Sequence, residues 1–200
     1  MSKTLIDFIR HGEPVGGRRY RGKTDDPLSE KGWDQMWQAV EAQRPWQRIV
    51  SSPLLRCAEF ARELGGQQRI PVTTDERFAE LGYGAWEGKT SEEIEAADPG
   101  AILRYRRDPL RYRPAGAEDM DAFVARYRAA WADLLDACAG RHVLVVAHAG
   151  VIRMALAHVL NIPPGCMFRI EVANAAITRF KIEGQGNDAV ASLVFHAGRL

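Results

Sequence analysis

Two histidines and two arginines stand shortly after apolar stretches of the chain. They are Arg10, His11, Arg56 and His148. The stretches before them, residues 5–9, 48–51 and 143–147, are predicted to be buried strands, because each is short and rich in apolar residues. In an open α/β sheet, ligands bind beyond the carboxyl ends of the parallel strands, which meet at one edge. We therefore expect the four side chains to converge at that edge.

These side chains suit the chemistry of a phosphoryl group. A neutral imidazole can attack phosphorus, which splits a hydrolysis into two easier displacements. A guanidinium offers a planar fork of donors that matches phosphate oxygens, and donors fixed in this way stabilise the charge of the transition state. Ala149 and Gly150 open the helix after His148, so their backbone N–H groups add donors and a partial positive charge. We include Ala149 among the predicted substrate contacts.

A proton donor is also required, because the alkoxide that leaves phosphorus must be protonated. A carboxyl group near the phosphate can supply the proton if it stays protonated near neutral pH. Glu80, in the glycine-punctuated loop 78–88, is the candidate, and Glu87 is the alternative. Glu118 precedes the longest predicted helix, where it either orients this loop or simply begins the helix; the sequence leaves both roles open.

Strands and helices are predicted to alternate through most of the chain. Strands are expected at residues 5–9, 48–51, 72–74, 143–147, 168–172, 176–182 and 190–196. Helices are expected where apolar residues recur at helical spacing: after Ser29, from Pro53 to about Leu64, over 120–138 and from 151 to 159. The second of these helices should end there because Gly65 and Gly66 follow it.

This alternation is typical of an α/β fold, here a three-layer α/β/α sandwich with a mostly parallel central sheet. A capping-box pattern at Thr90–Glu93 opens a helical stretch that three prolines break into short pieces. We predict one domain over residues 1–200, with a helical insertion around residues 89–118 over the active-site edge. Its five arginines form either a solvated face or a site of substrate capture: Arg104, Arg106, Arg107, Arg111 and Arg113.

Composition argues against several classes of protein. The chain has 200 residues and a formal net charge of +1, so nothing global favours nucleic acid or an anionic membrane as a partner. Its three scattered cysteines fit neither a disulfide framework nor a metal site. The first apolar stretch is too short for a secretory signal, and residues 142–162 carry histidines and an arginine that a membrane span would exclude. We expect a cytoplasmic protein.

Four motifs stand in order along the chain. They are Arg10-His11-Gly12-Glu13, Ser51-Ser52-Pro53-Leu54-Leu55-Arg56, the loop with Glu80, Gly84, Trp86, Glu87 and Gly88, and the segment from Val146 to Arg153. In this order they resemble the histidine phosphatase superfamily, in its phosphoglycerate-mutase-like branch, over nearly the whole chain. The resemblance implies hydrolysis of a small phosphomonoester through a phosphohistidine intermediate, with no metal or organic cofactor.

The resemblance also implies a role for each matched residue. His11 is the implied phosphoryl acceptor and Glu80 the implied proton donor. The implied phosphate ligands are Arg10, Arg56 and His148.

The loop after the first motif departs from the family. Many relatives carry there an asparagine that contacts the phosphate, whereas this chain has Gly16–Arg18. Arg19 or Arg21 is expected to take over that contact and to bind substrate. Residues Gly16–Asp25 look most like the α-ribazole phosphatases of cobalamin assembly, which favours α-ribazole 5′-phosphate as the substrate.

Three other interpretations stay open. The first is a mutase that returns the phosphoryl group to a sugar acid, although the extra chain typical of a cofactor-dependent mutase is missing. The second is a non-catalytic module that binds a phosphorylated ligand. The third is a metal site built on His11 and His148, for which no third ligand stands at a suitable spacing. The oligomeric state is also open, a homodimer included.

Overall fold

A mixed six-stranded sheet forms the centre of the molecule. The computed structural model describes residues 3–41, 44–184 and 189–198. Its strands are β1 (Thr4–Arg10), β2 (Arg48–Ser51), β3 (Val72–Thr74), β4 (His142–Ala147), β5 (Ile177–Glu183) and β6 (Val190–Gly198). They lie in the order β3-β2-β4-β1-β5-β6; the first four in this order run parallel, and β5 and β6 are antiparallel to their neighbours.

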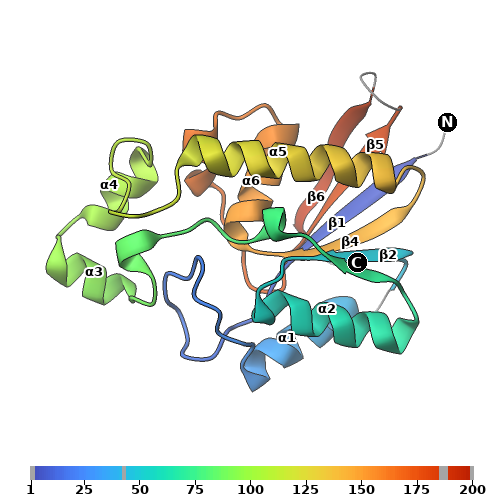
Figure 1. Cartoon of the computed structure of the whole chain (residues 1–200), viewed down its shortest axis with the longest axis horizontal. Coiled ribbons are helices and arrows are strands. Elements are labelled where there is room, and N and C mark those ends of the chain that lie inside the picture. The colour runs from blue at the N-terminus through green and yellow to red at the C-terminus, as the bar shows by residue number, and fades with distance from the viewer. Residues whose placement is uncertain (1–2, 42–43, 185–188, 199–200) are drawn as a thin grey trace.

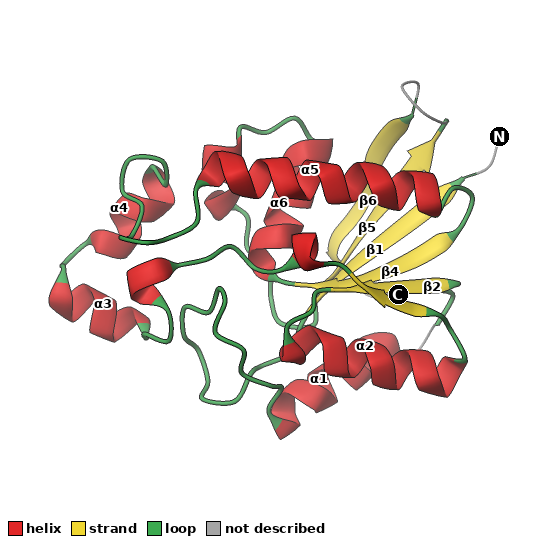
Figure 2. Ribbon diagram, viewed as in Figure 1, coloured by secondary structure: helices red, strands yellow, loops and turns green. Residues whose placement is uncertain are grey.

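Helices cover both faces of this sheet. They are α1 (Glu30–Val40), α2 (Leu55–Gln68), α3 (Ser91–Ala97), α4 (Ala101–Arg107), α5 (Met120–Ala137) and α6 (Ala149–Val159), with 3₁₀ turns at Glu76–Phe78, Gly84–Trp86 and Pro164–Arg169. Helices α5 and α6 lie on one face and α1 and α2 on the other, while α3 and α4 lie beyond one end of the strands (Figure 1). The layers are equally clear when coloured by secondary structure (Figure 2). The predicted three-layer α/β/α fold is confirmed.

Strand β4 shows why both faces are covered. Its side chains alternate between the two faces of the sheet. Val143 and Val145 are fully buried in the core cluster that includes residues of α5 and α6. Leu144 and Val146 are fully buried in the second cluster, with residues of α1 and α2. A strand that is apolar at every position therefore requires a helical layer on each side.

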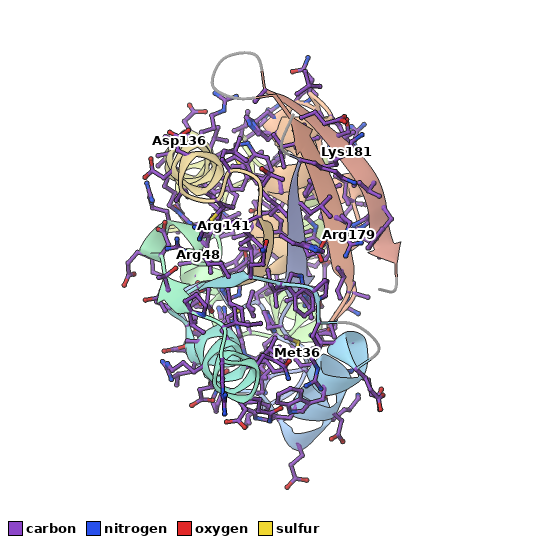
Figure 3. All side chains as sticks on the ribbon, turned by 90° about the vertical axis from the view of Figure 1, so that its right-hand side faces the viewer. Met36, Arg48, Asp136, Arg141, Arg179 and Lys181 are labelled. Carbon is purple, nitrogen blue, oxygen red and sulfur yellow. The ribbon has the colours of Figure 1, made fainter. Side chains whose placement is uncertain are left out.

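One carboxylate is buried beside this core. Asp7 of β1 accepts hydrogen bonds from the Trp46 indole (2.8 Å), from His142 Nε2 (2.9 Å), and from Arg179 Nε (2.7 Å) and Nη2 (2.9 Å). Burial alone would raise the pKa of Asp7, but the hydrogen bonds from Arg179 and His142 outweigh it and lower the pKa. The charged carboxylate thus ties β1 to its neighbours β4 and β5; Figure 3 labels Arg179 on β5.

The strand predicted over residues 168–172 is wrong. A 3₁₀ turn covers the first part of this segment, and no strand continues it. Its carbonyl groups serve side chains instead of a neighbouring strand: Ile170 O accepts from Arg153 Nε at 2.8 Å, and Val172 O accepts from Arg10 Nη1 at 2.6 Å. The apolar residues that suggested a strand, Phe168, Ile170 and Val172, pack instead on the core cluster that includes residues of α5 and α6.

The predicted end of α2 is also wrong, because the helix continues to Gln68. A Cβ on Gly65 would lie 2.2 Å from Val72 Cγ2, so the glycine allows α2 to pack closely on β3 and does not end the helix. The helix ends at Arg69, whose φ of 56° is left-handed.

No helix in the described part of the chain is long and apolar enough to cross a membrane.

Candidate active site

Strand register brings the predicted residues together. In the parallel sheet, Arg10 of β1 lies opposite Ala147 of β4, and Ser51 of β2 lies opposite Val146. The residues that follow these positions therefore leave the sheet at the same level. The imidazole rings of His11 and His148 lie with their centroids 5.2 Å apart. The convergence expected from the sequence is found for these two rings.

His11 is held as a neutral imidazole with one free nitrogen. Its Nδ1 lies 2.7 Å from the carbonyl oxygen of Gly12, and because a carbonyl only accepts, Nδ1 carries the proton. Nε2 is then left with its lone pair. Burial and the positive charges of Arg10 and Arg56 hold the pKa of His11 well below its usual range. The ring is thus uncharged at neutral pH, as a nucleophile requires.

His148 faces the same space and is fully buried. Its Nε2 lies 2.7 Å from Ser52 Oγ and 3.6 Å from Cys57 Sγ. Burial and the charge of Arg56 hold its pKa well below the usual range. His148 also caps the N-terminus of α6, and Ala149 is the first residue of that helix, where a backbone N–H has no acceptor within the helix. Both residues are therefore placed for contact with an anion.

Two guanidinium groups, of Arg56 and of the half-buried Arg10, have no carboxylate partner among the residues that the structure describes. Arg56 is fully buried, and among the described residues it donates only to carbonyl oxygens, of Thr24 at 2.7 Å, of Gly22 at 3.1 Å and of Arg21 at 3.5 Å. Arg10 donates to Val172 O, and the Nε–H of each arginine has no acceptor in the described part of the chain. Burial lowers the pKa of Arg10 to about 10, which leaves it charged. Because an unpaired buried charge is costly, the arrangement fits a site that receives an anion.

Glu80 lies against the N-terminus of α6. Both of its carboxylate oxygens accept from the Gly150 N–H at 3.1 Å, and Oε1 also accepts from the N–H of Leu81 at 2.9 Å. A Cβ on residue 150 would lie 2.2 Å from Glu80 Oε1. Glycine at position 150 is therefore what allows this carboxyl group to approach the helix end.

Glu87, the alternative acid, is hydrogen-bonded to the backbone of two neighbouring loops. Its carboxylate accepts from the backbone N–H groups of Gly22, Lys23, Thr24 and Tyr83 at 2.9–3.1 Å and from the Thr24 hydroxyl at 2.7 Å. Burial would raise the pKa of Glu87, but these hydrogen bonds outweigh it and lower the pKa. A carboxylate held in its charged form fastens the loop at 22–24 and makes a poor proton donor.

Arg21 is bonded within its own loop, and Arg19 is bonded to its own loop and to the loop that contains Glu80. Arg21 donates to Asp26 at 2.5 Å, Gly17 O at 2.6 Å and Val15 O at 2.7 Å. Arg19 donates to the carbonyl oxygens of Gly16 at 3.2 Å and Gly88 at 2.8 Å. Arg21 thus braces the loop that supplies the carbonyl groups to Arg56. A direct substrate contact by either arginine stays a prediction.

Two of the five arginines in the predicted insertion, Arg104 and Arg113, have local partners. Arg104 donates to Asp98 at 2.5 Å and to Pro99 O at 2.8 Å, and Arg113 donates to Asp119 at 2.5 Å. Both Arg104 and Arg113 are partly solvent-exposed in these pairs. These contacts fit a solvated face. A role in substrate capture stays a prediction.

Several contributors to the site were not predicted. No role was predicted from the sequence for Ser52, which lies beside His148, for Arg126, or for the carbonyl groups around Arg56. Ser52 could have been found, because it stands in one of the four motifs, directly after the end of a strand. Backbone carbonyl groups leave no such signal, because every residue has one. Among the described residues, no group of three or more metal-ligating side chains occurs.

Comparisons with known proteins agree with this geometry. A model of the histidine phosphatase superfamily (branch 1) matches residues 6–193. A bifunctional protein of Mycobacterium tuberculosis is 32% identical over 188 residues, which are 90% of this chain and 51% of that protein, so the chain spans about half the length of this relative. A glucosyl-3-phosphoglycerate phosphatase of Mycolicibacterium vanbaalenii is 36% identical over 167 residues, which are 78% of this chain and 74% of the relative.

A solved structure gives the same picture. A mycobacterial glucosyl-3-phosphoglycerate phosphatase in complex with VO3 superposes with a TM-score of 0.85 at 31% identity, covering 98% of both chains.

The environment of His11 predicts its titration. In protein free of phosphate, we expect its ring to stay uncharged from pH 8 down to pH 6, because burial and two guanidinium groups disfavour the imidazolium form. Nitrogen-15 chemical shifts of the histidine rings, assigned with a His11→Gln variant, measure this. A midpoint at the ordinary imidazole value of about 6.5 would contradict it.

Gly150→Ala should displace the Glu80 carboxyl group while the fold survives, because the clash is with the end of a flexible side chain. We expect kcat/KM for phenyl phosphate, whose leaving group needs a proton, to fall about 10-fold or more. Gly66→Ala is the matched control, since a Cβ at this position of α2 meets nothing within 4 Å. Equal kcat/KM values for the two variants would rule out the close approach at residue 150.

Proposed function

The chain belongs to the histidine phosphatase superfamily (branch 1), and on this premise we propose that it hydrolyses phosphomonoesters through a phosphohistidine on His11. One observation supports the proposal: a neutral imidazole, whose Nε2 has no hydrogen-bond partner among the described residues, lies beside two guanidinium groups that have no carboxylate partner among them either. This arrangement suits a dianionic phosphoryl group, which supplies the missing negative charge.

The reaction then runs in two displacements. His11 Nε2 attacks phosphorus, the bond from phosphorus to the ester oxygen breaks, and Glu80 gives its proton to the departing alkoxide. In the second step the Glu80 carboxylate takes a proton from water as the water oxygen attacks phosphorus. The bond from phosphorus to Nε2 breaks, and inorganic phosphate leaves. Arg10, Arg56 and His148 donate to the phosphoryl oxygens in both steps.

The substrate is placed in the class of small phosphorylated metabolites. The relatives named as glucosyl-3-phosphoglycerate phosphatases support a phosphate on a glycosylated sugar acid as the first choice. The appearance of residues Gly16–Asp25 supports α-ribazole 5′-phosphate as the second. A phosphoglycerate mutase activity would use the same phosphohistidine and differs only in the final acceptor.

Phosphate release from these two esters, and from p-nitrophenyl phosphate, tests the proposal. We expect the wild-type protein to release phosphate from glucosyl-3-phosphoglycerate with the higher kcat/KM of the two metabolites. His11→Ala should lose turnover of all three, because the change removes the nitrogen atom that attacks phosphorus. Surviving p-nitrophenyl phosphate turnover in that variant would refute the role of His11, and turnover of none by the wild type would favour a non-catalytic module.

The mutase alternative has its own readout. With 3-phosphoglycerate, with and without 2,3-bisphosphoglycerate, isomerisation faster than phosphate release would favour a mutase over a phosphatase.

A further inference from the structure

Arg126 of α5 holds the backbone on the N-terminal side of Glu80. Its Nη1 donates to the carbonyl oxygens of Arg77 and Ala79, both at 2.7 Å, and its Nη2 donates to the carbonyl oxygen of Glu80 itself at 3.1 Å. The same guanidinium forms a two-point pair with Glu118, at 2.7 Å and 2.9 Å. One side chain thus fixes three backbone carbonyl groups between Arg77 and the proposed acid, Glu80.

Glu118 holds the loop on the other side of Glu80. Its Oε2 accepts from the N–H of Gly82 at 3.1 Å, and its own N–H donates to the carbonyl oxygen of Gly82 at 2.9 Å. Burial would raise the pKa of Glu118, but the hydrogen bond from Arg126 outweighs it and lowers the pKa, so the pair is charged at neutral pH. The backbone is therefore fastened both before and after the acid.

The carboxyl group of Glu80 has no such side-chain support among the described residues. Its hydrogen bonds come only from two backbone N–H groups, of Leu81 and Gly150. Its position is consequently set by where the loop backbone lies relative to α6. A displacement of about 1 Å is enough to cost a proton-transfer step a large factor in rate, because that step depends on close geometry.

We propose that Arg126, together with Glu118, is a positioning residue for Glu80: the pair holds residues 77–82 so that the carboxyl group reaches the leaving oxygen. This inference rests on the proposed function. The pair acts on proton donation to the leaving group and leaves the attack by His11 on phosphorus unaffected.

A comparison of leaving groups separates this role from a general structural one. Arg126→Met should lower kcat/KM for phenyl phosphate about 100-fold, and that for 2,4-dinitrophenyl phosphate less than about 3-fold, because the dinitrophenolate leaves without a proton. Arg179→Met is the matched control, since Arg179 forms the same kind of two-point pair with Asp7 in the sheet. The control should change both kcat/KM values by the same factor.

Glu80→Gln provides the second half of the test. In that background Arg126→Met should lower kcat/KM for phenyl phosphate less than about 3-fold further, because the group that it positions is already disabled. Glu118→Gln should reproduce the leaving-group pattern, and it carries the test if Arg126→Met does not fold. Two results would overturn the inference. One is that Arg126→Met lowers kcat/KM by the same factor for both esters; the other is that it lowers kcat/KM for phenyl phosphate as much in the Glu80→Gln background as in the wild type. Activity retained by His11→Ala would instead overturn the proposed function.

Discussion

Two guanidinium groups that have no carboxylate partner among the described residues set the conditions for the rest of the site. Arg10 donates to one carbonyl oxygen and Arg56 to several, and these satisfy hydrogen bonds without cancelling charge. Burial of the His11 and His148 rings, together with the field of these guanidinium groups, holds the pKa of each ring well below its usual range and keeps the ring uncharged. The same field attracts a phosphoryl dianion, so the arrangement that binds the substrate also keeps the nucleophile in its reactive form.

Three glutamates near this pocket differ in what surrounds them, and the differences separate their roles. Glu87 accepts from several backbone N–H groups and is fixed as a charged tie. Glu118 is paired with Arg126. Among the described residues, Glu80 accepts from only two backbone N–H groups, and one of them is at the N-terminus of α6. Among these three, only Glu80 lacks both the arginine pair of Glu118 and the set of N–H donors around Glu87, so it is the one left for proton donation.

Much of the fold and of the site follows from the sequence. The unbroken apolar run at residues 143–147 predicts a strand covered on both faces, and the pairing of parallel strand ends predicts that His11 and His148 meet. The failures share one cause, contacts between separate elements of the folded structure. The carbonyl groups of residues 170–172 serve two arginines and no strand, Gly65 serves packing against Val72, and Arg126 reaches a loop more than forty residues earlier. Local pattern carries no information about such partners.

The proposed hydrolysis depends on a covalent bond between phosphorus and one nitrogen atom of His11, and rapid quenching detects that bond directly. Protein mixed with ³²P-labelled p-nitrophenyl phosphate is stopped in alkali within the first turnover, digested, and its labelled peptide sequenced by mass spectrometry. We predict a phosphoramidate that is stable to alkali and labile to acid, on the peptide that contains His11. Label on another residue, or full phosphate release with no labelled protein during the first turnover, would contradict the mechanism.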